Sequence, residues 1–160
     1  LHNIYCWIWY FVYMVDLMDK EISQYGFNDI HVGLEKIFQI TVTESMLDNF
    51  AQLSGDFNPL HTDKEYAVSS GFDGRVCHGM LLGSFFSRLI GMYLPGKQAL
   101  YFSQSLKFVN PCMINEKVTI KGEVLDKSSA TNIITIKTTI INESKKIIVD
   151  GIAYVKVRDN

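Results

Sequence analysis

The order of apolar and polar positions divides residues 26–160 into stretches of strand and helix character. Residues 36–42 are typical of a strand, and from Thr43 to Leu53 the apolar residues fall at helical spacing. Four later runs alternate or are rich in β-branched residues, which predicts strands. They cover residues 99–109, 116–126, 132–142 and 146–157. The turns between these runs are short, and short turns favour antiparallel neighbours.

Residues 79–92 are predicted to form a central helix. They are apolar on almost every face, and only Ser84, Ser87 and Arg88 interrupt them. A helix that is hydrophobic all round is buried, and this one is far shorter than the ~20 residues that cross a bilayer. We therefore expect an α+β domain in which an antiparallel sheet wraps around a buried helix.

The edges of this predicted sheet bear on the oligomeric state. A sheet of about five strands covers a helix only partly and leaves edge strands with unpaired backbone groups. Pairing with a second copy of the chain would cover them. We therefore expect a homodimer.

Composition supports one domain and argues against several classes of partner. A chain of 160 residues with 48% hydrophobic residues can bury a sizeable core. Its 15 basic and 17 acidic residues are mixed along the chain, so no nucleic-acid surface is indicated. The three cysteines are widely spaced and form no C-x-x-C pair, which argues against a disulfide framework or a zinc site. We expect a cytoplasmic protein without a bound metal.

Residues 1–25 are expected to be an N-terminal extension outside the domain, which would comprise residues 26–160. Residues 4–15 are almost continuously apolar but too short for a membrane span. No basic residue precedes them and no small-residue cleavage site follows, so a signal peptide is not indicated. We expect residues 1–17 to be dispensable for folding, and a short segment that binds a membrane surface or a partner is the alternative.

Two short motifs carry the candidate chemistry. Residues 56–61 read DFNPLH and are expected to form a loop, because the residue before Pro59 is disfavoured in a helix. The second motif, CHGML at residues 77–81, opens the central helix. In this order the motifs resemble the MaoC-like dehydratases, or (R)-specific enoyl-CoA hydratases, and the similarity extends over residues 36–157. This resemblance implies the hotdog fold, in which a sheet wraps around a central helix.

The resemblance also implies a reaction and residues to perform it. Adding water to a trans-2-enoyl thioester needs a base, an acid and donors that hold the enolate oxygen. The matching aspartate and histidine, Asp56 and His61, are the implied catalytic pair, and Asn58 is implied to help arrange the site. The substrate would carry coenzyme A or acyl carrier protein, and no further cofactor is implied.

The central helix is expected to supply the remaining parts of the site. Gly79 lies at its first turn, where a backbone N–H can serve as the oxyanion hole, as the family resemblance also implies. Ser87 lies ~12 Å further along the helix and is expected in the acyl pocket. The other expected pocket residues are Leu82, Phe86 and Ile90. His78 is expected to brace the loop or cap the helix, and Cys77 to pack without reacting.

The sequence leaves two other functions open. Residues 74–77 depart from the family pattern, in which a proline and an aliphatic residue commonly precede the histidine, and this departure is expected at the entrance to the site and not at the acid–base pair. A hotdog thioesterase would direct water at the thioester carbonyl, and a silent subunit would only bind acyl chains. The pairing of Asp56 with His61 argues against both.

Overall fold

The computed structural model describes residues 21–158, which form one antiparallel sheet with helices on one side. The strands are β1 (Glu35–Thr41), β2 (Ala99–Gln104), β3 (Lys107–Phe108), β4 (Lys117–Ser128), β5 (Ile133–Asn142) and β6 (Ile147–Val157). Their order is β1-β4-β5-β6-β2, and β3 also pairs with β6. Every pairing is antiparallel, as predicted.

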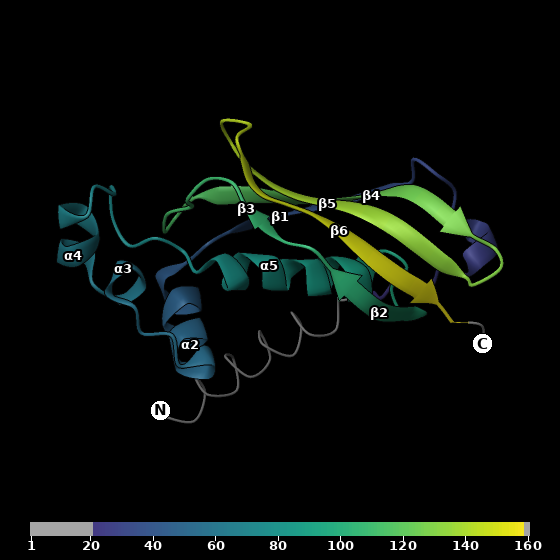
Figure 1. The fold of residues 1–160 in the computed structure, drawn as a ribbon, viewed down its shortest axis with the longest axis horizontal. Helices are drawn as coiled ribbons and strands as arrows, with labels where there is room; N and C mark the ends of the chain where they lie inside the picture. Colours follow the sequence, from purple (N-terminus) through teal and green to yellow (C-terminus); the bar gives the residue numbers. More distant parts are fainter. Residues whose placement is uncertain (1–20, 159–160) are drawn as a thin grey trace, which may run out of the picture.

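The longest α-helices lie where the periodicity predicted them. The helical elements are η1 (Phe27–Asp29), α2 (Glu44–Ser54), α3 (Pro59–Thr62), α4 (Lys64–Ser69), α5 (Gly79–Arg88) and the π-helical turn η2 (Leu89–Tyr93). Thr43 caps α2, since its hydroxyl accepts a hydrogen bond from the Met46 amide at 3.3 Å. Figure 1 shows α5 running along the sheet, with α2, α3 and α4 gathered at one end of the molecule.

The core lies between α5 and one face of the sheet. Side chains of a strand alternate between its two faces, and on β5 every second residue from Ile134 to Ile140 is fully buried. Phe86 of α5 and Leu89 of η2 pack into the same cluster as Ile120 and Ile140. A second cluster joins Ile90 and Leu94 to Ile134 and Ile136 of β5. The apolar face of the sheet thus packs against α5 and η2, which confirms the predicted α+β fold.

In the described chain, α5 is buried on one side only, which corrects the expectation of a helix buried on every face. Leu82 and Phe86 face the sheet and are buried, whereas Met80 is 58% exposed. Ser84, Ser87 and Arg88 are also exposed. The physical reason is that the sheet is open and covers one side of the helix. The polar interruptions in the helix sequence mark the uncovered side.

Two boundaries also differ from those predicted. The run at residues 99–109 divides into β2 and β3, because the Ser105 hydroxyl accepts the Ile152 amide at 2.9 Å at the break in the strand. Residues 56–61 are not entirely loop, because α3 begins at Pro59. Proline is tolerated at the first helical position, where its missing N–H would have no intrahelical partner.

Backbone hydrogen bonds join residues before 26, within the predicted N-terminal extension, to the segment that follows η2. The Lys97 amide donates to the Ser23 carbonyl at 2.8 Å, and the Tyr25 amide donates to the Pro95 carbonyl at 3.1 Å. Gly96 lies between these contacts with a φ of +80°, and a Cβ there would lie 1.9 Å from the Ser23 oxygen. Residues 23–25 are thus packed against the segment that follows η2.

Residues 1–20 lie outside the described part of the chain, so the expectations for residues 4–15 and 1–17 remain predictions. Within residues 21–158, no helix has both the length and the apolar character needed to cross a membrane.

Replacing Gly96 with alanine should destabilise the fold more than the same change at Gly33. Both glycines have positive φ, so each change costs ~1 kcal/mol or more in backbone strain. A Cβ at Gly33 meets nothing within 4 Å, whereas at Gly96 it displaces Ser23. Urea unfolding of both variants measures the difference, and equal losses would contradict the fixed position of residues 23–25.

Candidate active site

The site begins where α2 ends. Gly55 ends the helix in the left-handed conformation, with a φ of 76°, and Asp56 follows it. One carboxylate oxygen of Asp56 accepts a hydrogen bond from the Asn58 amide at 3.2 Å. The side-chain oxygen of Asn58 in turn accepts from the Leu60 amide at 2.9 Å and caps α3. The DFNPLH motif therefore turns the chain sharply and starts the short helix that carries His61.

His61 is held in one orientation by a contact from residue 76. Its Nδ1 donates to the Val76 carbonyl oxygen at 2.8 Å. A carbonyl oxygen only accepts, so Nδ1 carries the proton, and in the neutral ring Nε2 is left as an acceptor. The Val76 amide also donates to the Leu60 carbonyl at 3.0 Å. The backbone carbonyl of Val76 thus determines which ring nitrogen of His61 can accept a proton.

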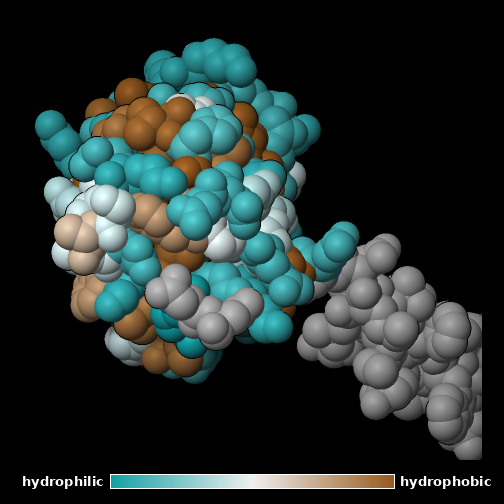
Figure 2. All heavy atoms as spheres, turned by 90° about the vertical axis from the view of Figure 1, so that its right-hand side faces the viewer, coloured by the Kyte–Doolittle hydropathy of each residue, from teal (hydrophilic) through white to brown (hydrophobic). Residues whose placement is uncertain are grey.

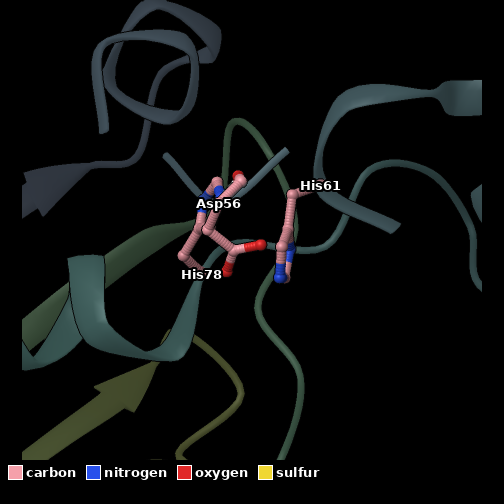
Figure 3. A group of neighbouring side chains, drawn as sticks. All are labelled: Asp56, His61 and His78. Atoms are coloured by element: carbon pink, nitrogen blue, oxygen red, sulfur yellow. Dashed lines mark hydrogen bonds between the residues drawn. The ribbon is translucent and has the colours of Figure 1, made fainter. Parts of the chain in front are cut away.

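Asp56, His61 and His78 form one cluster (Figure 3), with one polar atom from each lying within 4.8 Å of the others. The rings of His61 and His78 lie 3.9 Å apart, centre to centre, at an angle of 30°. His78 Nε2 donates to the backbone oxygen of Asp56 at 3.0 Å. His78 therefore braces the Asp56 loop, one of the two roles expected for it.

Burial lowers the pKa of His78 below its ordinary value, because its imidazole is only 2% exposed and desolvation disfavours the charged ring. The hydrogen bond to the Asp56 backbone opposes this shift, and the neighbouring His61 adds to it. Among the described residues, Asp56, His61 and His78 are also the group placed to share a metal ion. The expectation of a site without metal stays a prediction.

The cluster opens into a cavity of about 530 Å³. Its polar end contains Asp56, His61, His78 and Gly79. The apolar lining residues are Phe50, Phe72, Val76, Cys77, Met80, Leu82, Phe108, Val109, Pro111, Cys112, Ile148 and Val149. This combination of an apolar cavity with a few polar groups at one end suits a substrate with an apolar chain and one reactive end.

Gly79 is the first residue of α5 and lines the cavity. Its amide belongs to the first turn, whose N–H groups have no intrahelical acceptor and lie at the positive end of the helix dipole. A Cβ at this position would lie 2.9 Å from the Phe108 ring. The glycine is therefore required by the packing of β3 over the start of α5, a constraint that the sequence did not reveal.

The cavity of the described chain includes only one of the four predicted pocket residues. Leu82 lines it, whereas Phe86, Ser87 and Ile90 do not. Phe86 and Ile90 are buried in the core against the sheet, and Ser87 is exposed on the uncovered side of α5. Part of the lining comes from the start of α5 and the residues before it, and part comes from segments far from α5 in sequence, such as Phe108 and Ile148, which helix spacing could not indicate.

Cys77 and Cys112 are buried free cysteines that both line the cavity. The Cys77 amide donates to the Cys112 carbonyl at 2.8 Å. The hydrogen bond between the two thiols and their burial raise the pKa of Cys112 well above its usual range. A thiol held in its protonated form is a poor nucleophile, in keeping with a packing role.

Fold and site together define a class of protein: an α+β hotdog domain with an aspartate and a histidine at the end of an apolar cavity, beside a helix N-terminus. Comparison with known families agrees. The family described as "MaoC like domain" matches residues 29–146. The chain belongs to this family.

Characterised relatives and solved structures are similar over most of the chain. An (R)-specific enoyl-CoA hydratase of Aeromonas caviae is 43% identical over 108 residues, 68% of this chain and 81% of that protein. A 3-hydroxybutyryl-CoA dehydratase of Methylorubrum extorquens is 33% identical over 140 residues, 88% of each chain. The unliganded R-hydratase PhaJ1 of Pseudomonas aeruginosa superposes with a TM-score of 0.83 at 32% identity, covering 87% of this chain and 89% of that one.

Stability should depend on pH through His78. Its pKa in the folded state is lowered, so the unfolded chain takes up a proton near pH 6.5 before the folded protein does. The contribution of neutral His78 to the free energy of unfolding is complete above the pKa of the unfolded chain. It declines as the pH falls toward the lower pKa of the folded protein. The free energy of urea unfolding, measured between pH 7.5 and 5, should decline less steeply in His78→Gln.

His31→Gln is the matched control, because it removes an exposed histidine and leaves the cluster intact. Identical pH profiles for wild type and His78→Gln would contradict the assigned shift. Titration of the His78 ring by NMR reports its pKa directly and should place it below that of an unfolded-chain histidine.

Proposed function

We propose that this protein is an (R)-specific 2-enoyl-CoA hydratase, which interconverts a trans-2-enoyl thioester and a 3-hydroxyacyl thioester by adding or removing water. The observation that carries the proposal is the convergence of Asp56 and His61, with polar atoms within 4.8 Å, at the cavity end next to Gly79. Relatives named as enoyl-CoA hydratases and as a 3-hydroxybutyryl-CoA dehydratase support it, since these names describe one equilibrium read in two directions.

The orientation of the two side chains suggests how the proton moves. The carboxylate of Asp56 and Nε2 of His61 are both acceptors, so together they can hold one water by its two hydrogens. As the water oxygen bonds to C3, the pair takes its proton, and the electrons of the C2–C3 double bond pass toward the thioester oxygen. The same proton then goes to C2, because neither group carries one to donate at the start.

The negative charge that develops on the thioester oxygen needs donors already in place. The Gly79 amide at the start of α5 is the proposed donor, and the helix dipole adds to its effect. Only proton transfers and this electrostatic support are required, so the proposal includes no metal, flavin or nicotinamide. Coenzyme A enters as part of the substrate, and acyl carrier protein is the other carrier to be tested.

We further propose that the protein acts as a homodimer in the cytoplasm. Apolar side chains remain uncovered on the side of α5 and at the β2 edge, where Met80, Leu100 and Phe102 are 58%, 47% and 59% exposed. Figure 2 shows further brown patches among hydrophilic side chains at the end of the molecule where β2 begins. A second copy would bury such surface and pair the edge strand. The free thiols of Cys77 and Cys112 suit a reducing compartment.

Incubation with crotonyl-CoA should remove the enoyl absorbance without releasing free thiol, and chiral analysis should show the (R)-3-hydroxy product. A water held on one face of the enoyl plane attacks only from that face, which is why one enantiomer is expected. Release of thiol would instead indicate a thioesterase, and no reaction would indicate a silent subunit. The same assay with crotonyl-acyl carrier protein identifies the carrier.

Asp56→Asn and His61→Gln are the variants that test the catalytic pair in this assay. Each should lower kcat by about 10²- to 10⁴-fold, the usual contribution of a positioned proton-transfer group. The double variant should lose much less than the product of the two single losses, because both groups act on one water. A folded single variant with nearly full activity would require another catalytic pair.

Light scattering on the purified protein should give about twice the mass of one chain. Phe102→Glu places a charge on the exposed β2 edge and should shift the protein toward the monomer. Glu143→Lys, on the β5–β6 turn, is a control that also changes a surface charge. A monomeric wild-type protein with full activity would contradict the proposed dimer.

A further inference from the structure

Arg75 is a nearly buried arginine close to the site but outside the cavity lining. Its side chain is only 9% exposed, and all three guanidinium nitrogens are engaged. Nε donates to the His61 carbonyl oxygen at 2.6 Å. Nη1 pairs with Glu44 at 2.9 Å, and Nη2 pairs with Asp48 at 2.5 Å. The guanidinium therefore connects the backbone of His61 to the first half of α2.

These contacts join the separate segments that carry the site. Asp56 follows the end of α2, His61 lies on α3, and Gly79 opens α5 just after Arg75 in sequence. Next to Arg75, Val76 holds the His61 ring through its carbonyl. Residues 75 and 76 thus fix His61 at two points, one on its backbone and one on its ring.

The strengths of these contacts suggest that Arg75 contributes more to the position of His61 than to the stability of the fold. Glu44 and Asp48 have side chains that are 67% and 57% exposed, and ion pairs with exposed partners contribute little to folding. A hydrogen bond from a charged donor to a carbonyl is stronger, and this one is sheltered on the arginine side. The carboxylates of Glu44 and Asp48 orient the Arg75 guanidinium, which in turn binds the backbone of α3.

We propose that Arg75 is a positioning residue for His61, which it holds through the bond from Nε to the His61 carbonyl while Glu44 and Asp48 anchor its guanidinium to α2. The proposal rests on the catalytic role of His61 proposed above and adds a residue to it. Arg75 lies in the stretch that leads from α4 to α5, one residue before the Val76 carbonyl that accepts from the His61 ring. Its positive charge also helps to keep the neighbouring His78 neutral.

The test compares Arg75→Met with wild type in the crotonyl-CoA assay. Methionine keeps the apolar stem but removes all three donors, so α3 loses its backbone anchor. A displacement of ~1 Å in a catalytic group can cost about 10²-fold, and we expect kcat to decrease by roughly 10- to 100-fold. KM should change by less than about 3-fold, because Arg75 does not line the cavity.

Lys121→Met is the matched control. Lys121 also pairs with two carboxylates, Glu35 at 2.6 Å and Glu123 at 3.2 Å, but these lie on the sheet. This variant should keep kcat within about 2-fold of wild type. An equal loss of kcat in both variants, or a rise in KM alone in Arg75→Met, would overturn the proposal.

A second readout separates positioning from general loosening. The His61 Nδ1 proton is held by the Val76 carbonyl and should give an exchange-protected imidazole resonance by NMR, which Arg75→Met should weaken and Lys121→Met should not. Glu44→Gln combined with Asp48→Asn keeps the bond from Nε to His61 and should lower kcat less than Arg75→Met does. A full loss of kcat in this double variant with an unchanged His61 resonance would overturn the proposal, because activity would then be lost without any release of His61.

Arg75→Lys covers the case in which Arg75→Met does not fold. Lysine keeps the charge but cannot reach three acceptors in three directions, so kcat should still decrease. Full kcat with an unchanged His61 resonance in Arg75→Lys would overturn the proposal. His61→Gln, measured in parallel, distinguishes failure of the Arg75 proposal from failure of the proposed function. Full activity in His61→Gln would exclude the catalytic role of His61 itself.

Discussion

The packing of α5 against the sheet is the interaction on which the rest of this structure depends. It buries Leu82 and Phe86 in one cluster with Val118 and Ile120 of β4 and Ile140 of β5. Because Gly79 is the first residue of the same helix, the packing that stabilises the fold also determines where the helix N-terminus lies. The position of the proposed oxyanion donor is thus set by the hydrophobic core and does not depend on a mobile loop.

The polar part of the site is held mainly by backbone contacts between segments that are separate in sequence. The carbonyl of Val76 orients the His61 ring, and the carbonyl of Asp56 accepts from His78. Backbone acceptors choose which ring nitrogen is protonated, because a carbonyl only accepts hydrogen bonds. The path of the chain around the two imidazoles therefore determines which nitrogen of each ring donates a hydrogen bond.

Gly79 contributes both to the packing of the fold and to the site, and its neighbour Phe108 does the same. The absence of a side chain lets the Phe108 ring approach α5, and the same position lines the cavity next to the polar cluster. Phe108 also contributes to the apolar wall. Fold and site consequently share residues, and a change at the start of α5 affects both.

The sequence by itself determined the order and type of the main elements, the antiparallel pairing, and the motifs that bring Asp56, His61 and Gly79 to attention. Periodicity and turn chemistry are local, so one sequence contains them. The brace from His78, the cross-link through Arg75 and the walls from Phe108 and Ile148 emerged only in the tertiary structure. So did the exposed side of α5 and the burial of Phe86 and Ile90 away from the cavity. These features depend on which segments meet across the fold. The spacing of residues along the chain does not show which distant segments will be in contact.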